Sequence, residues 1–288
     1  MEKEIPGVKY GTDIEHIHRM RVASRRLRAI LPLFRKCFNQ KDYKRWVRSI
    51  KTVARALGTA RDTDVQIAFL EDFIHSHDLG TGNLAIIDQI LIPMGERRKK
   101  EQEAVLAALK TLEKERILDE LRAALRRKGK GSADSRSTEQ GRRLYTVARE
   151  RISLLLDDLL AYESNLLDPA DITGHHAMRI AAKNLRYTLE IYRRLYKNRL
   201  RQFIKNLKVI QEILGEIHDC DVWIGMLSGD LDIPGSELAT SSRLSIATLL
   251  QDRKECREDL YRKMVTQWLD LRDKGFWDNL RKTVNLTR

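Results

Sequence analysis

Two stretches of the sequence decide the predicted fold: His18-Arg-Met-Arg-Val-Ala-Ser-Arg-Arg-Leu-Arg28 and His176-Ala-Met-Arg-Ile-Ala-Ala-Lys-Asn-Leu-Arg186, which align at an offset of 158 residues. Downstream, Leu57-Gly-Thr-Ala-Arg-Asp-Thr-Asp-Val65 aligns with Leu214-Gly-Glu-Ile-His-Asp-Cys-Asp-Val222 at an offset of 157 residues. Two blocks that recur in the same order and at almost the same separation indicate an internal duplication. We therefore predict two related four-helix-type bundles, arranged with pseudo-two-fold symmetry.

Glycine and proline are scarce, with 15 and 5 residues in a chain of 288, and neither occurs in residues 175–214 or 236–274. Apolar residues recur at the helical period along most of the chain. Together these features predict an all-α fold. We expect helices over residues 12–38, 41–57, 61–77, 84–127, 137–166, 171–196, 199–214, 217–228, 237–273 and 276–285.

The expected helix ends have chemical signals. Gly58 and Gly215 each follow a leucine and suit left-handed C-caps, Asp171 suits an N-cap, and Pro32 should kink the first helix. Residues 126–137 are basic and rich in Gly and Ser, which is typical of a flexible linker. Within one domain over 1–288, we thus expect a first bundle over 1–128, a linker over 129–137 and a second bundle over 138–288.

The composition indicates a folded, basic protein. Its 42% hydrophobic residues can bury a core beside 33% charged residues, and its formal net charge of +13 favours an anionic partner. The N-terminal residues MEKEIPGVKYG carry no apolar signal core, and no apolar run of about 18 residues suggests a membrane span. Three widely spaced cysteines offer no disulfide framework. We therefore expect a protein of the reducing cytoplasm.

The first repeated block predicts a helix with two contrasting faces. At about 100° per residue, its basic residues and histidine fall on one arc, while Met20, Ala23, Leu27, Ile30, Leu31 and Phe34 fall on the opposite, apolar arc. The basic arc contains His18, Arg21, Arg25 and Arg28. The second copy repeats this division, with His176, Arg179, Lys183 and Arg186 on its basic arc.

The helix that follows each block carries a second basic stripe. In the first copy the stripe is Lys44, Arg48, Lys51 and Arg55, and in the second it is Arg201, Lys205 and Lys208, with Glu212 at the fourth position. Like charges at i, i+4 destabilise an isolated helix. Their recurrence on matched helices of both copies therefore favours an anion-binding groove or channel, lined by both repeats, over a merely solvated face.

These blocks resemble the CHAD family, the conserved-histidine α-helical domains, over nearly the whole chain. The resemblance implies an all-α fold of two four-helix bundles, and a basic surface with a central cavity that binds inorganic polyphosphate. The Glu-x-Glu-x-Lys strand of the CYTH domains that often accompany this family does not occur here. One departure is that only about 12 residues precede the first histidine helix. The first bundle is therefore abbreviated or completed by another element.

The leading hypothesis is non-catalytic binding of inorganic polyphosphate in the cytoplasm, without a cofactor, by a protein that could associate with polyphosphate granules. Arginine binds phosphate oxygens in pairs and lysine supplies mobile point charges, which suits a linear polyanion. His18 and His176 either contact phosphate or orient their neighbours. The expected binding residues are His18, Arg21, Arg25, Arg28, Lys44, Arg48, Lys51, Arg55, His176, Arg179, Lys183, Arg186, Arg201, Lys205 and Lys208.

Two other function classes compete with this hypothesis. A nucleic-acid-binding protein would have the same electrostatics, but aromatic residues make up only 6% of the chain and none lies within the basic arcs. A phosphate-processing metalloenzyme would need a metal site. The pairs Asp62/Asp64 and Asp219/Asp221 could hold Mg²⁺ or Ca²⁺, or could instead cap helices or pair with arginines. Zinc at His16/His18, His75/His77 or His175/His176 is disfavoured, because none of these pairs has the i, i+4 spacing.

Overall fold

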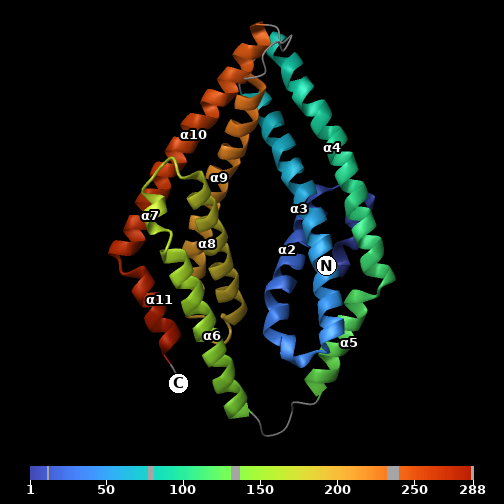
Figure 1. Cartoon of the computed structure of the whole chain (residues 1–288), viewed down its shortest axis with the longest axis vertical. Coiled ribbons are helices and arrows are strands. Elements are labelled where there is room, and N and C mark those ends of the chain that lie inside the picture. The colour runs from blue at the N-terminus through green and yellow to red at the C-terminus, as the bar shows by residue number, and fades with distance from the viewer. Residues whose placement is uncertain (12, 77–80, 131–136, 232–239, 287–288) are drawn as a thin grey trace. The chain divides into compact units, whose positions relative to one another are not determined.

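A computed structural model describes residues 1–11, 13–76, 81–130, 137–231 and 240–286 (Figure 1). Throughout these ranges the regular structure is helical and no strand occurs, which confirms the all-α prediction. Within the same ranges, no helix is long and apolar enough to cross a membrane. The chain divides into two compact units, unit 1 (Met1–Ser135) and unit 2 (Arg136–Arg288).

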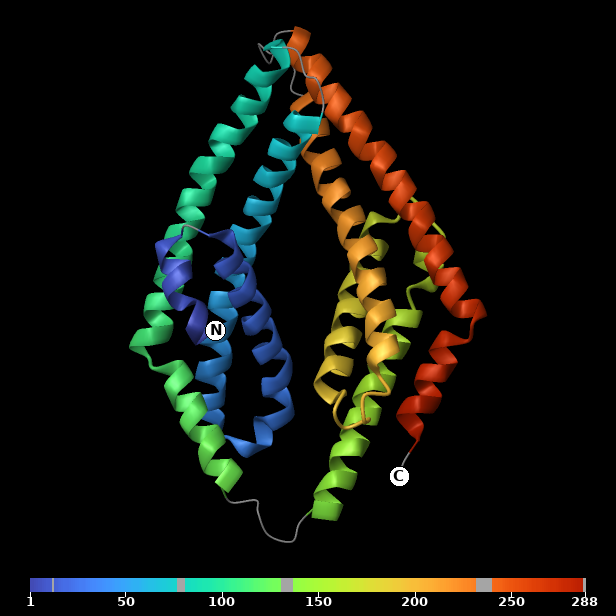
Figure 2. The same ribbon diagram turned by 180° about the vertical axis from the view of Figure 1, so that it is seen from behind.

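Unit 1 is built on three packed helices with short elements at each end. Its order is the 3₁₀ helix η1 (Glu2–Glu4), α1 (Ile5–Tyr10), α2 (Ile14–Ile30), the 3₁₀ helix η2 (Leu31–Cys37), α3 (Gln40–Ser76), α4 (Thr81–Lys114) and α5 (Ile117–Lys130). Helix α3 packs against both α2 and α4. The elements that precede the first histidine helix are η1 and α1, which pack on α2 (Figure 2).

Unit 2 has a similar central arrangement, with a long helix, α6 (Ser137–Leu160), before its histidine helix where unit 1 has the short α1. Its order is α6, α7 (Glu163–Leu166), α8 (Ile172–Tyr192), α9 (Arg201–Leu231), α10 (Thr240–Asp273) and α11 (Phe276–Asn285). Helix α9 packs against α8 and α10, and α6 packs against α8 and α11 (Figure 1). As predicted, Asp171 caps α8, since its side chain accepts a hydrogen bond from the Gly174 amide at 2.7 Å.

The glycines of the second repeated block do not end helices, contrary to the sequence prediction. Gly58 lies inside α3 and Gly215 inside α9, so the expected pairs of helices 41–57/61–77 and 199–214/217–228 are each one continuous helix. An internal glycine costs only about 1 kcal/mol relative to alanine, which packing along a long helix outweighs.

Other helix boundaries also differ from expectation. The helix expected over 137–166 is interrupted after Leu160, and the short α7 follows from Glu163. Helix α2 stops at Ile30, and Pro32 lies in η2, so the proline ends the α-helix rather than kinking it. The helix expected over 84–127 is broken between α4 and α5, where Arg116 has φ of +50°. At the predicted linker, α5 continues to Lys130 and α6 begins at Ser137, and residues 131–136 lie outside the described ranges.

Each unit has its own apolar core. In unit 1 the core joins Ile17 and Met20 of α2 to Ile50, Val53 and Leu57 of α3, and α4 and α5 add Val105, Leu109, Leu112, Ile117 and Leu121. In unit 2, Met178, Leu185 and Leu189 of α8 are buried, as are Ile210 and Leu214 of α9. Burying this apolar surface is the main stabilising term for both units.

Candidate anion-binding surface

The cations predicted on α2 and α3 lie at the surface of unit 1. On α2, His18, Arg21 and Arg25 are half-buried and Arg28 is exposed. The α3 stripe, defined as Lys44, Arg48, Lys51 and Arg55, is exposed throughout. Its members follow the i, i+4, i+7, i+11 spacing of one helix face, and the same spacing continues to Gly58 and Asp62.

Arg21 connects the two basic helices of unit 1. Its guanidinium lies over Gly58, where an added Cβ would be 4.0 Å from Arg21 Nε, and its Nη2 lies 3.5 Å from Asp62 Oδ1. A methyl group added at Gly58 would thus meet this guanidinium at ordinary contact distance, on the α3 face that carries the stripe. Arg21 and the α3 stripe therefore belong to one basic surface of unit 1.

Unit 2 has the same arrangement on α8 and α9. The α9 stripe, defined as Arg201, Lys205 and Lys208, is exposed, and its spacing continues through Glu212 to Gly215. A Cβ on Gly215 would lie 3.6 Å from Arg179 Nε. Lys208 is 3.3 Å from Glu212, an exposed i, i+4 pair that weakens this end of the stripe only slightly. On α8, His176, Arg179 and Lys183 are half-buried.

Arg186 differs from the other predicted cations because its side chain is only 11% exposed. It forms an ion pair with Glu190, and its Nε donates to Gln211 Oε1 at 2.9 Å. The guanidinium also lies 4.3 Å from the ring centroid of Tyr187. These contacts tie α8 to α9, and they leave Arg186 less available to an external anion than the exposed stripe residues.

His176, the histidine of the repeated block in unit 2, contacts another histidine. Nδ1 of His176 lies 3.2 Å from Nδ1 of His218 on α9, and the ring centroids are 4.4 Å apart. Burial lowers the pKa of His176, and the positive charges of His218, Arg179 and Lys183 lower it further. A hydrogen bond between two Nδ1 atoms requires at least one neutral ring. An anion near these cations would favour the protonated form.

In each copy of the second block, one of the two paired aspartates forms a buried ion pair with an arginine. Asp64 pairs with Arg98 of α4 at 2.6 Å, and Asp221 pairs with Arg257 of α10 at 2.5 Å. In both pairs the side chains are 7% exposed for aspartate and 15% for arginine. This confirms the sequence alternative that these aspartates pair with arginines. In the part of the chain that the structure describes, no group of three His, Cys, Asp or Glu side chains is placed to hold a metal ion.

In two of the three histidine pairs considered for zinc, one histidine has another side chain as its contact. His16 Nδ1 lies 2.9 Å from Oε2 of Glu4, whereas His18 lies at the basic surface. His175 is buried and stacks near Tyr261 at 5.6 Å, away from the His176–His218 contact. His77 lies outside the described residues, so the His75/His77 pair is not described.

Sequence reasoning missed the partners supplied by distant helices, namely Arg98, Arg257, His218 and Gln211. Arg98 and Arg257 follow their aspartates by 34 and 36 residues. The two arginines are 159 positions apart, close to the repeat offset, so extending the alignment to α4 and α10 could have found them.

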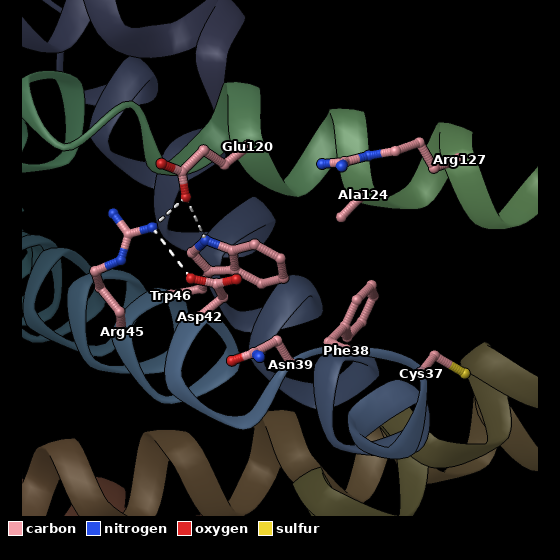
Figure 3. Close-up of a pocket in the computed structure, with 9 residues that line it drawn as sticks. All are labelled: Cys37, Phe38, Asn39, Asp42, Arg45, Trp46, Glu120, Ala124 and Arg127. Carbon is pink, nitrogen blue, oxygen red and sulfur yellow. Dashed lines mark hydrogen bonds and ion pairs between the residues drawn. The ribbon is translucent and has the colours of Figure 1, made fainter.

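A separate cavity of about 500 Å³ opens between the start of α3 and α5 in unit 1. Figure 3 shows Arg45, Trp46 and Glu120 pointing toward one another at one end of it. Trp46 Nε1 donates to Glu120 at 3.1 Å and Arg45 also pairs with Glu120, which together hold the pKa of this carboxyl below its usual value. These polar groups are hydrogen-bonded or ion-paired with one another, and none of the α3-stripe residues lines the cavity.

The fold and surface define a class: an all-helical protein with two units, each presenting basic side chains from its histidine helix and from the helix that follows. The chain belongs to the CHAD family, because the CHAD domain model matches residues 1–228. Among solved structures it is similar to PptA from Streptomyces chartreusis, with a TM-score of 0.60 and 15% identity over 90% of this chain and 91% of that chain. This likeness supports the fold. No curated protein matches the chain.

Proposed function

We propose that this protein binds inorganic polyphosphate through the basic surfaces of both units and does not turn it over. The observation that carries the proposal is the recurrence of one arrangement in both units: an exposed cation stripe that ends at a glycine covered by an arginine. Arg21 covers Gly58 and Arg179 covers Gly215. Membership of the CHAD family supports a polyphosphate ligand at the level of the family.

The spacing of the stripes suits a linear polyanion. Successive cations four and three residues apart lie about 4.5–6 Å apart along the helix axis. Such a row can follow a chain of phosphates that has no bases to read. Exposed lysines and arginines bind by charge and by hydrogen bonds to phosphate oxygens, and counterion release makes binding of this kind strongly dependent on salt.

The non-catalytic part of the proposal rests on the roles of the repeated acidic residues. Asp64 and Asp221 are buried and paired with Arg98 and Arg257. Asp62 lies 3.5 Å from Arg21. A carboxylate oxygen that already accepts a hydrogen bond from a guanidinium is not free to hold a metal ion, which supports a structural role for Asp64 and Asp221. In this proposal Asp64 and Asp221 hold helices and arginines in place, whereas Asp62 is an exposed side chain beside Arg21.

The test compares two variants with the same change in net charge. In the first, Lys44, Arg48, Lys51 and Arg55 of the α3 stripe are replaced by serine. In the control, four exposed lysines of α4 are replaced by serine, namely Lys99, Lys100, Lys110 and Lys114. We expect the stripe variant to lose at least tenfold more affinity for fluorescently labelled long-chain polyphosphate, with a shallower salt dependence. Equal losses would show that net charge alone drives binding and would contradict the proposal.

Two further measurements separate the competing functions. Competition with duplex and single-stranded DNA at equal phosphate concentration should leave most polyphosphate bound. Phosphorus NMR of polyphosphate incubated with the protein and Mg²⁺ or Mn²⁺ should show no released phosphate. A preference for DNA would favour the nucleic-acid-binding alternative, and turnover lost in Asp62→Asn would favour the metalloenzyme.

The hypothesis that stripes of both repeats line one groove stays a prediction. It can be tested by a double-mutant cycle between Lys51→Ser in unit 1 and Lys208→Ser in unit 2, with long-chain and short-chain polyphosphate as ligands. If one chain engages both units, the two losses will be coupled for the long chain and independent for the short one. Association with polyphosphate granules likewise stays a prediction.

A further inference from the structure

An apolar groove lies between α2 and α5 of unit 1, apart from the basic surface. Its volume is about 870 Å³. Leu121 is buried at its floor, Leu27, Ile30 and Leu118 are half-buried, and Leu125 is 47% exposed. The apolar lining of this α2–α5 groove is Ala23, Leu27, Ile30, Leu118, Leu121 and Leu125. Leu27 therefore lies on the apolar face of α2, as predicted from the sequence, but it is only half-buried.

Unit 2 has matching positions on α8 and α11. Aligned at the repeat offset, Ala23 and Leu27 correspond to Ala181 and Leu185 of α8. Helices α5 and α11 also correspond, because each begins directly after a residue with positive φ, Arg116 in one and Gly275 in the other. Their apolar residues have the same spacing, so that Leu118, Leu121 and Leu125 match Trp277, Leu280 and Val284.

In unit 2 these positions are buried because a helix covers them. Ala181 is 2% exposed, Leu185 is 0% exposed and Val284 is 3% exposed. Helix α6 packs against both α8 and α11, with Ala148, Ile152, Leu156 and Leu159 as its buried face (Figure 1). Among the described residues of unit 1, Met1 and η1 lie along the corresponding groove in place of such a helix. Unit 2 therefore shows what kind of element fits this groove, namely an amphipathic helix.

The rim of the groove indicates the charge of that helix. Arg19 and Arg26 of α2 and Arg122 and Arg126 of α5 border it. Glu4 pairs with Arg19 at 2.9 Å, and Glu2 pairs with Arg122. These contacts show carboxylates already seated against the rim arginines at the end of the groove that η1 occupies. A helix with acidic residues beside its apolar face would continue the same pattern.

We propose that the α2–α5 groove of unit 1 binds an amphipathic helix of a partner protein, with acidic residues flanking the apolar face of that helix. This is the helix-in-groove mode of recognition, in which apolar anchors at i, i+3, i+4 and i+7 enter the groove and charges at the rim set orientation. The site is independent of polyphosphate binding, because none of the stripe residues lines it. The protein would thereby place a partner next to a polyanion.

The probe is a synthetic peptide with the sequence of residues 142–160 of α6, in which Arg142, Arg143, Arg149 and Arg151 are replaced by glutamate. The peptide keeps the apolar face with which α6 packs in unit 2. Its glutamates are placed beside that face so that they can pair with the arginines at the rim of the α2–α5 groove. We expect saturable binding to the full chain by fluorescence anisotropy. A second peptide with Ile152, Leu156 and Leu159 replaced by serine should bind at least tenfold more weakly.

The protein variants locate the binding. Leu125→Glu places a charge at an exposed groove position and should weaken binding of the acidic peptide at least tenfold, with an unchanged thermal melt. The matched control, Leu106→Glu, changes a leucine on α4 that is 36% exposed and lies outside the groove, and it should bind as the unchanged protein does. Both variants should keep their affinity for polyphosphate, so failure here and failure of the polyphosphate proposal are distinguishable.

Three outcomes would overturn the inference. Equal binding by both protein variants would place the peptide elsewhere. If the unmodified, arginine-containing peptide bound as tightly as the acidic peptide or more tightly, the inference that the partner helix carries acidic residues beside its apolar face would be wrong. Self-association of the unchanged protein in sedimentation, lost in Leu125→Glu, would make a second copy the occupant rather than a partner protein.

Discussion

Arg28 of unit 1 and Arg186 of unit 2 occupy aligned positions in the repeated block, yet they have different surroundings. Arg186 is buried between Glu190 and Gln211, whereas Arg28 is exposed. At the repeat offsets, Glu190 corresponds to Pro32 and Gln211 to Ala54, neither of which offers a side-chain acceptor. The same motif residue is thus part of a structural ion pair in one unit and an exposed surface cation in the other.

Other aligned positions are the same in both units. The Asp64–Arg98 and Asp221–Arg257 pairs have nearly equal lengths and equal exposures, and both glycines of the second block lie under an arginine. The comparison thus distinguishes two kinds of position. Residues of the Asp–Arg ion pairs occur in both units together with their partners. The position of Arg28 and Arg186 has a role that depends on neighbours that differ between the units. Four predictions test this distinction, from the largest expected effect to the smallest.

The largest effect is expected at the buried ion pairs. Asp221→Ala leaves Arg257 buried without its partner and should lower the free energy of unfolding by about 3–5 kcal/mol. The loss of unfolding free energy in Asp64→Ala should lie at the lower end of this range, because Arg98 still has Gln102 as an acceptor at 3.2 Å. Urea denaturation followed by circular dichroism measures both. The control is Asp62→Ala, at a side chain that is 69% exposed, and losses no larger than its own would contradict the structural role.

The second prediction separates the aligned arginines. Arg186→Ala should lower the free energy of unfolding by about 2 kcal/mol, since it removes charge-assisted hydrogen bonds from a buried site. Arg28→Ala should change it by less than about 0.5 kcal/mol but weaken polyphosphate binding. Denaturation and binding are measured on both variants. Equal effects in both assays would mean that the two arginines share one role after all.

The third prediction concerns the internal glycines. Gly58→Ala and Gly215→Ala should each raise the free energy of unfolding by roughly 1 kcal/mol, because alanine favours helix and the new methyl group would meet the arginine at ordinary contact distance. Gly225→Ala is the control in α9, where nothing lies within 4 Å of the added Cβ. If the control stabilises the protein while the other two variants destabilise it, both units need glycine at this position.

The smallest effect is a pH dependence specific to unit 2. Burial lowers the folded-state pKa of His176 below its value of about 6.5 in the unfolded chain, so the unfolded state binds more protons in that window. Stability should therefore fall as pH drops below about 6.5. Thermal melts between pH 5 and 8 should show a smaller decline for His176→Gln than for the unchanged protein. An identical decline would assign it to other groups, such as His175, whose pKa burial also lowers.

Much of the fold could be predicted from the sequence, because helical periodicity is a local property. The basic arcs and the exposed stripes on α3 and α9 follow directly from residue spacing. The helix ends could not be predicted as well. The sequence around Gly58 predicts the end of a helix. In the structure α3 continues past Gly58, because it packs against α2 and α4. Likewise, Leu27 is apolar and on the expected face, but its burial depends on a covering helix that unit 2 has in α6.

The sequence by itself determined that the chain is helical and rich in basic residues, and which residue types line the polar face of each helix; it also predicts the internal duplication. Only the tertiary structure decided which of those charges are paired, because partners such as Gln211, Arg98 and Arg257 lie 25 to 36 residues away on other helices. A charge on a helix face is set by local spacing, whereas its desolvation and its counter-charge are set by what packs against that face.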